Sequence, residues 1–199
     1  MKNIFTLLVI FIIMAVGAKA QDSEAYLDNA SSEYKSGNLE NARFNLQQML
    51  QEINVAIGRD ILALLPEELA DMQKVEDADN ASGINTGYAG IFVNRSYTAE
   101  NRNAAIEIMS DSPLLSGINI LLNMPIFIAG DPMQKRIKID GQKALLTKNT
   151  SAEGKIGYDV QMAFGSTLLT FNCSGVDSEN EVTAMLNKIP IQEIQKVAQ

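Results

Sequence analysis

The chain has 199 residues, with 24 Asp and Glu against 16 Lys and Arg, one cysteine and no histidine. The net charge of −8 argues against a nucleic-acid partner, because phosphate backbones repel an acidic surface. The lack of histidine excludes Ser-His-Asp and Cys-His catalysis and histidine-containing zinc sites, while a single cysteine excludes an intramolecular disulfide and a cysteine-only zinc site.

The first 20 residues have the pattern of a secretory signal peptide. Lys2 supplies a positive charge, residues 4–16 are almost uniformly apolar, and residues 18–20 (Ala-Lys-Ala) place small side chains before a cleavage site at Gln21. The apolar stretch is shorter than the ~20 residues of a membrane span. We therefore expect a chain in the bacterial periplasm or secreted, without stable membrane insertion after cleavage. An uncleaved N-terminal anchor is the alternative.

Residues 21–72 predict a helical hairpin. Helix-forming residues over 25–36 are interrupted at Gly37-Asn38, and a second helix is expected from Leu39 to about Ala56. Gly58 is predicted to end it, with a short further helix over residues 61–65. The apolar residues of the second helix recur at the spacing of one face: Leu39, Ala42, Leu46, Met49, Leu50 and Ile53.

The turn of this hairpin carries a weak motif. Tyr34, Gly37 and Ala42 have the spacing Tyr-x2-Gly-x4-Ala, which resembles the turn region of one helix pair of the tetratricopeptide type. The resemblance covers about 30 residues, and the sequence contains no second copy, whereas solenoids need about three repeats. It implies a lone helical hairpin and no repeat scaffold.

Residues 73–87 predict a linker, because they are acidic and then rich in Asp, Asn, Ser and Gly. Asp77 and Asp79 invite comparison with a calcium-binding loop. Such a loop needs glycine at its sixth position and a carboxylate at its twelfth, where this sequence has Ser82 and Tyr88. We therefore expect a solvated loop and no metal site.

Residues 88–199 predict an α+β domain. Alternating apolar and polar residues indicate about six antiparallel strands, over residues 91–97, 106–108, 136–139, 143–148, 158–164 and 169–173. Helices are expected over residues 178–188 and 191–197, and Cys173 is expected in the core. The predicted fold class is α+β, with an N-terminal helical hairpin followed by an antiparallel sheet that has inserted and C-terminal helices.

Residues 109–127 contain the candidate site. Asp111 or Ser112 is expected to cap a helix that begins near Pro113. Its apolar face carries Leu114, Leu115, Ile118, Leu121 and Leu122, which we expect to be core. The alternative is a ligand or partner surface, because residues 124–128 add a second apolar segment that can line a pocket. This surface would consist of Leu114, Ile118, Leu121, Met124, Ile126 and Phe127.

No catalytic residues are predicted. Ser110 or Ser112 would need a desolvated lysine as base, but Lys135, Lys138 and Lys143 have polar sequence surroundings. Nothing in the sequence pairs the carboxylates of Glu107, Asp111 and Asp159.

The sequence therefore indicates a non-enzymatic binding or assembly protein without a cofactor or metal. Its expected partner is another protein or a small apolar ligand. The alternatives are a carrier of a lipid-like apolar molecule and, third, a hydrolase that works without histidine.

Overall fold

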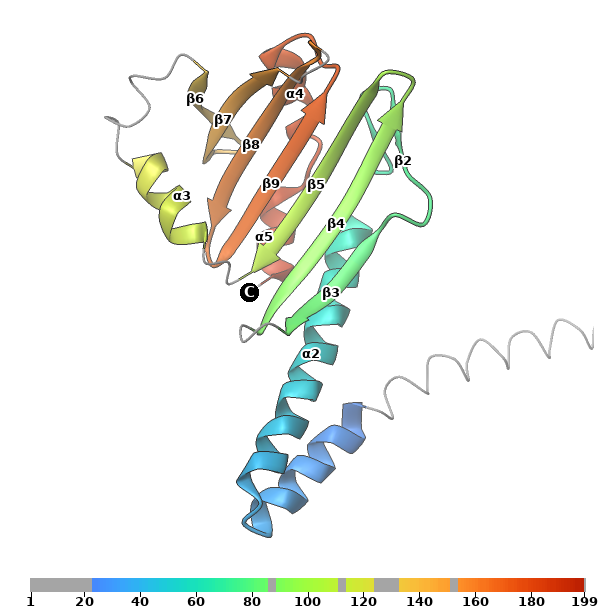
Figure 1. Ribbon diagram of the computed structural model, residues 1–199, viewed down its shortest axis with the longest axis vertical. Helices are drawn as coiled ribbons and strands as arrows, with labels where there is room; N and C mark the ends of the chain where they lie inside the picture. The colour runs from blue at the N-terminus through green and yellow to red at the C-terminus, as the bar shows by residue number, and fades with distance from the viewer. Residues whose placement is uncertain (1–22, 86–88, 111–113, 124–132, 151–153, 199) are drawn as a thin grey trace, which may run out of the picture. The chain divides into compact units, whose positions relative to one another are not determined.

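The computed structural model describes residues 23–85, 89–110, 114–123, 133–150 and 154–198 (Figure 1). The predicted signal peptide and its cleavage site lie outside these residues. The chain divides into two compact units, Met1–Ile53 and Asn54–Gln199. The described part of the first, residues 23–53, is called the helical unit below, and that of the second the sheet unit.

Two helices form the helical unit. The first spans residues 23–35, and the second, α2 (Leu39–Leu64), begins after a short turn. Gly37 adopts a φ of +84°, which favours glycine, and the Asn38 N–H donates to the Glu33 carbonyl at 2.9 Å. The Asn38 side chain accepts from the Asn41 N–H at 3.4 Å and caps α2. The break predicted at Gly37-Asn38 is confirmed.

Helix α2 is longer than predicted, with 26 residues that continue into the sheet unit. The prediction that Gly58 ends this helix is wrong, because Gly58 is a packing position. A Cβ atom there would lie 3.2 Å from the Cβ of Ala81 and 3.5 Å from Cγ2 of Val93. The missing side chain therefore lets the α2 backbone approach the sheet closely, at a cost in helix propensity of about 1 kcal/mol.

The sheet unit contains one antiparallel sheet of nine strands, in the order β1-β2-β4-β5-β9-β8-β7-β6, with β3 paired to β4 beside β2. The strands are β1 (Glu68–Leu69), β2 (Met72–Lys74), β3 (Asn80–Asn85), β4 (Ala89–Ala99), β5 (Arg102–Ser110), β6 (Gln134–Ile139), β7 (Gln142–Thr150), β8 (Ile156–Phe164) and β9 (Thr167–Ser174).

The α+β class and the N-terminal helices are confirmed, but the predicted number of about six strands is wrong. The six predicted strands correspond to β4–β9, and the additional ones, β1–β3, come from residues 68–85. Part of this segment is the predicted linker. Strands of two or three residues have too few positions for an alternating pattern. Their burial depends on single residues, Leu69 and Met72, which are fully buried.

The main core lies on one face of the sheet, which is covered by the end of α2 and by α4 (Glu179–Leu186) and α5 (Ile191–Val197) (Figure 1). Ser178 caps α4, because its hydroxyl accepts from the Glu181 N–H at 3.3 Å. Alternate strand residues face these helices, and the largest fully buried side chains include Tyr97, Ile106, Ile108, Leu146, Tyr158, Met162, Leu169 and Phe171. Cys173 joins this core as predicted.

Helix α3 (Leu114–Asn123) packs on the opposite face of the sheet, against β7, β8 and β9. Its predicted cap at Asp111 or Ser112 lies outside the described residues. No helix in the described parts of the chain is long and apolar enough to cross a membrane.

Candidate functional site

Ile118 of α3, expected in the core with a ligand or partner surface as the alternative, is covered by protein. It is 7% exposed and packs with Leu122, Leu145 and Leu168 in a small second core. Leu145 and Leu168 belong to β7 and β9, so this cluster attaches α3 to the sheet. A ligand could reach Ile118 only by displacing α3.

The other residues of the predicted surface are less defined. Leu114 and Leu121 belong to α3, but their side chains are outside the described part, as are Met124, Ile126 and Phe127 entirely. Their role as a ligand or partner surface therefore stays a prediction.

Ser110, the candidate serine of β5, is buried and hydrogen-bonded to the neighbouring strand. Its hydroxyl oxygen accepts a hydrogen bond from the Ile91 N–H at 2.7 Å. Lys135 forms an ion pair with Glu179, and Lys143 donates to the Asn123 side chain at 3.0 Å. Lys135 is therefore engaged with α4 and Lys143 with α3, and neither contact involves Ser110. Ser112 and Asp111 lie outside the described residues.

The carboxylates of Glu107 and Asp159 are not neighbours. Glu107 on β5 is opposite Thr170, and Asp159 on β8 is opposite Asn172, so β9 separates the two acids and they differ by two residues in register. Two strand spacings alone separate their backbones by about 10 Å. Asp159 accepts a hydrogen bond from Asn149 at 2.7 Å.

The most heavily engaged charged group of the sheet unit is Arg95 on β4, which is 4% exposed. Its Nε donates to Asp79 Oδ1 at 2.9 Å and its Nη2 to Oδ2 at 2.5 Å, which is a bidentate ion pair. Its Nη1 donates to the Leu65 carbonyl at 2.7 Å. Arg95 therefore joins β4 to the segment before β3 and to the end of α2.

This cluster shifts the pKa values of its members. The hydrogen bond from Arg95 lowers the pKa of Asp79, and the same contact raises the pKa of Arg95. Burial raises the pKa of Tyr97, whose hydroxyl donates to the Pro66 carbonyl at 2.8 Å. These contacts hold β4, the segment before β3 and the end of α2 together.

Sequence reasoning missed this pairing. Asp79 was expected in a solvated loop, whereas its side chain is 30% exposed and bound to Arg95. One feature of the sequence could have indicated it, since Arg95 occupies an inward position in the alternation of Ile91, Val93 and Tyr97. An arginine on the apolar side of a strand needs a buried partner.

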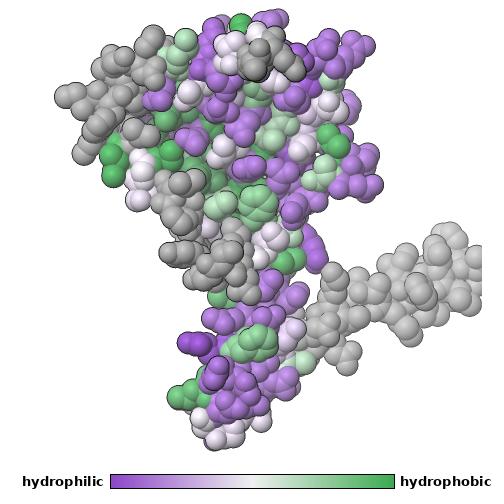
Figure 2. All heavy atoms as spheres, in the orientation of Figure 1, coloured by the Kyte–Doolittle hydropathy of each residue, from purple (hydrophilic) through white to green (hydrophobic). Residues whose placement is uncertain are grey.

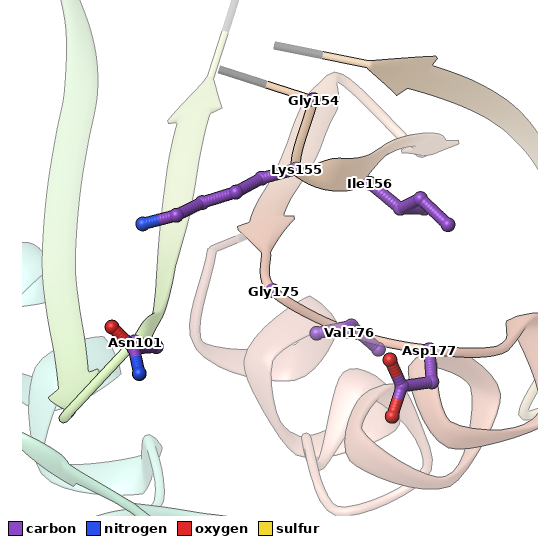
Figure 3. A pocket seen from close by; sticks show the side chains of 7 residues that line it. All are labelled: Asn101, Gly154, Lys155, Ile156, Gly175, Val176 and Asp177. Atoms are coloured by element: carbon purple, nitrogen blue, oxygen red, sulfur yellow. The ribbon is translucent and has the colours of Figure 1, made fainter.

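A cleft of about 300 Å³ lies where three connections meet (Figure 3). It is lined by Asn101, Gly154, Lys155, Ile156, Gly175, Val176 and Asp177. Lys155 extends toward the side of Asn101, and Asp177 lies on the other side of the cleft (Figure 3). Gly175 has a φ of +71°, and a Cβ there would lie 2.4 Å from the Asn101 carbonyl oxygen, so a side chain is excluded.

The cleft has a mixed lining, in which Ile156 and Val176 are apolar and three other side chains are polar or charged. Lys155 supplies a cation, Asp177 an anion and Asn101 an amide, and the described lining holds no hydroxyl or thiol nucleophile. Such a set can hydrogen-bond a small zwitterionic molecule, but it contains no nucleophile with a neighbouring base. The described residues also hold no group of three or more Cys, Asp or Glu side chains arranged to bind a metal ion.

Exposed apolar side chains are concentrated in the helical unit. Of nine large hydrophobic residues that are exposed among the described ones, seven lie between residues 27 and 53: Leu27, Tyr34, Leu39, Phe44, Leu46, Leu50 and Ile53. Figure 2 shows such residues in green among the purple hydrophilic surface of this unit. Only Ala30 and Ala42 are fully buried hydrophobic residues in its described part. The helical unit therefore carries most of the exposed large hydrophobic side chains of the described chain.

This surface is the candidate functional site, because apolar patches of more than a few hundred Å² on soluble proteins mark interaction sites. Comparison of the chain with known protein families, with curated proteins and with solved structures gave no match.

Proposed function

We propose that the chain is a non-enzymatic binding or assembly protein of the bacterial envelope, exported to the periplasm or secreted, and that it binds another protein through its helical unit. The observation that supports this proposal is the concentration of exposed hydrophobic residues between Leu27 and Ile53. Two helices that bury only two alanines gain little from their own contact. The first of them, residues 23–35, is in the length range of about 12–15 residues in which isolated helices are marginal in water. A partner that covers the apolar side chains supplies the missing stabilisation.

Export forms part of the proposal and rests on residues 1–20. N-terminal sequencing of the protein recovered from its compartment should begin at Gln21. Recovery of a chain that retains Met1 in the membrane pellet would contradict export.

Photo-crosslinking in the native compartment tests the binding role. A benzophenone amino acid replaces Leu39 of the helical unit in one variant and Lys138, an exposed residue of β6, in the control. We expect a discrete crosslinked product from position 39, none from position 138, and loss of the product when Leu46→Asp is added. Equal crosslinking at both positions, or none at position 39, would contradict a binding surface on the helical unit.

A further inference from the structure

The exposed apolar residues of α2 form a stripe. Leu39, Leu46, Leu50 and Ile53 are separated by seven, four and three positions, which places them on one side of a helix within an arc of about 60°. Each is between 43% and 62% exposed. We call these four residues the α2 stripe. Phe44 is also exposed but lies on another side of the helix, because it is two positions before Leu46.

The first helix adds two exposed apolar residues on the same side of the helix pair, Leu27 and Tyr34. Ala30 and Ala42, the buried residues, mark the faces by which the two helices meet. Leu27 and Tyr34 stand three residues before and four after Ala30, and Leu39 and Leu46 stand in the same relation to Ala42. The helices of an antiparallel hairpin are related by an approximate twofold axis, so equal offsets lie on the same side of the pair.

Three residues of the α2 stripe are spaced symmetrically, whereas Leu50 has no exposed counterpart on the other side of Leu46, because that position is the buried Ala42. Leu39 and Ile53 each lie seven residues, two helical turns, from Leu46. If two stripes pair antiparallel about a twofold axis at Leu46, each Leu39 meets the Ile53 of the other copy and the two Leu46 side chains meet at the axis. Such self-complementarity is what an isologous interface requires.

We propose, on the basis of the binding function above, that the partner that covers this apolar surface is a second copy of the chain, paired antiparallel through the α2 stripe. The stripe contains no charged residue, so the acidic charge of the chain does not meet itself there, and more distant charges are screened beyond about 8 Å at physiological ionic strength. Six half-exposed large side chains present a few hundred Å² of apolar surface. That is a substantial part of the ~800 Å² per partner that a specific interface buries.

Sedimentation equilibrium of the chain recovered after export tests the pairing. We expect a dimer for the wild type and at least a tenfold weaker dimer for Leu46→Asp. Phe44→Asp is the matched control, because it places the same charge on an exposed apolar position of α2 outside the stripe, and it should leave the dimer unchanged. The sheet unit should unfold at the same urea concentration in all three proteins, which separates lost pairing from lost folding.

Disulfide trapping tests the direction of pairing. With the buried Cys173 left in place, Leu46→Cys should form a disulfide-linked dimer under mild oxidation, and Leu39→Cys should do so only when mixed with Ile53→Cys. A Leu39→Cys homodimer would contradict the antiparallel arrangement. The chain with Cys173 alone should stay unlinked.

The outcomes separate this inference from the proposed function. A monomer at all concentrations, together with a crosslink from position 39 to a different protein, would overturn self-pairing and leave the binding role standing. A monomer with no crosslink from position 39 would overturn both.

Discussion

The two units of the chain handle apolar side chains in opposite ways. The sheet unit buries a continuous core that includes Phe171, Ile106 and Met162, all fully buried. The helical unit also contains large hydrophobic residues, but seven of them are exposed, and its fully buried hydrophobic residues in the described part are Ala30 and Ala42. The difference indicates that the sheet unit is stabilised by its own packing, whereas our proposal is that the helical unit gains stability from a partner.

The largest expected effect comes from one substitution made in each unit. Phe171→Ala removes a fully buried ring from the main core, and it should lower the free energy of unfolding of the sheet unit by ~3–5 kcal/mol. Phe44→Ala removes an exposed ring of α2 and should change it by less than about 0.5 kcal/mol. Urea unfolding followed by far-ultraviolet circular dichroism measures both. Equal effects would mean that Phe44 is packed in solution and would remove the contrast between the units.

Ile118 gives the next largest effect and tests whether α3 belongs with the buried or the exposed surface. Ile118→Asp places an unpaired carboxylate beside Leu145 and Leu168, and it should cost about 2–4 kcal/mol in the same experiment. Asn119→Asp, on an exposed neighbouring position of α3, should stay within about 0.5 kcal/mol of the wild type. If Ile118→Asp left the urea midpoint unchanged, the face of α3 that carries Ile118 would be exposed to solvent and would not belong to the core.

Asp79 is expected to make the stability of the sheet unit depend on pH. Its folded pKa is lowered by Arg95, so its contribution is complete above the ordinary carboxyl pKa of about 3.9 and disappears as pH falls through the lowered folded value. Asp79→Asn leaves the buried Arg95 without its anion and should cost about 1–3 kcal/mol at pH 7, a range that allows for the 30% exposure of the Asp79 side chain.

Unfolding free energies of both proteins between pH 7 and pH 2 measure this contribution. The difference between wild type and Asp79→Asn should shrink toward zero at the acid end, because protonated aspartate resembles asparagine. Asp77→Asn is the control, since Asp77 is exposed with a φ of +60° that asparagine tolerates. A constant difference across the pH range would show that Asp79 acts through its shape and that its charge contributes nothing.

The sequence predicted those elements whose burial repeats along the chain. Strands β4–β9 alternate strongly enough to be recognised, and the helices α4 and α5 carry apolar residues at helical spacing. The short strands β1 and β2 were missed because each contributes a single buried side chain, and no period exists in one residue. Gly58 was misinterpreted because its close contact with Ala81 and Val93 is visible only when the sheet is formed.

The sequence predicted the apolar face of the second helix, but it did not predict that this face is exposed. The spacing of Leu39, Leu46 and Ile53 predicted an apolar face of the second helix, but a period says nothing about what covers that face. Only the exposure of these residues in the folded chain distinguishes an interaction surface from a core. Residues 124–128, which kept the alternative site on α3 open, lie outside the described residues.

The last prediction uses thiol labelling, which has the smallest expected effect on stability. It is the most direct probe of the contrast between the sheet unit and the helical unit. Cys173 is buried in the main core, and burial raises the pKa of its thiol to about 12. An ordinary cysteine has a pKa of about 8.5, so the reactive thiolate of Cys173 is much scarcer near neutral pH than that of an exposed cysteine. Native wild-type protein should therefore react with a maleimide or disulfide reagent only as fast as the sheet unit opens.

A second thiol in the helical unit supplies the comparison. Phe44→Cys adds a cysteine at an exposed position of α2. The new thiol at position 44 should be labelled rapidly, whereas the Cys173 thiol of the same protein should stay protected until urea is added. Mass spectrometry of peptides assigns the two rates within one molecule, so the protein and reagent concentrations are the same for both thiols. Rapid native labelling of Cys173 would place β9 facing the opposite way or in a sheet that opens freely. Slow labelling at position 44 would show that the helical unit is already covered on that side, and the interface would then extend beyond the α2 stripe.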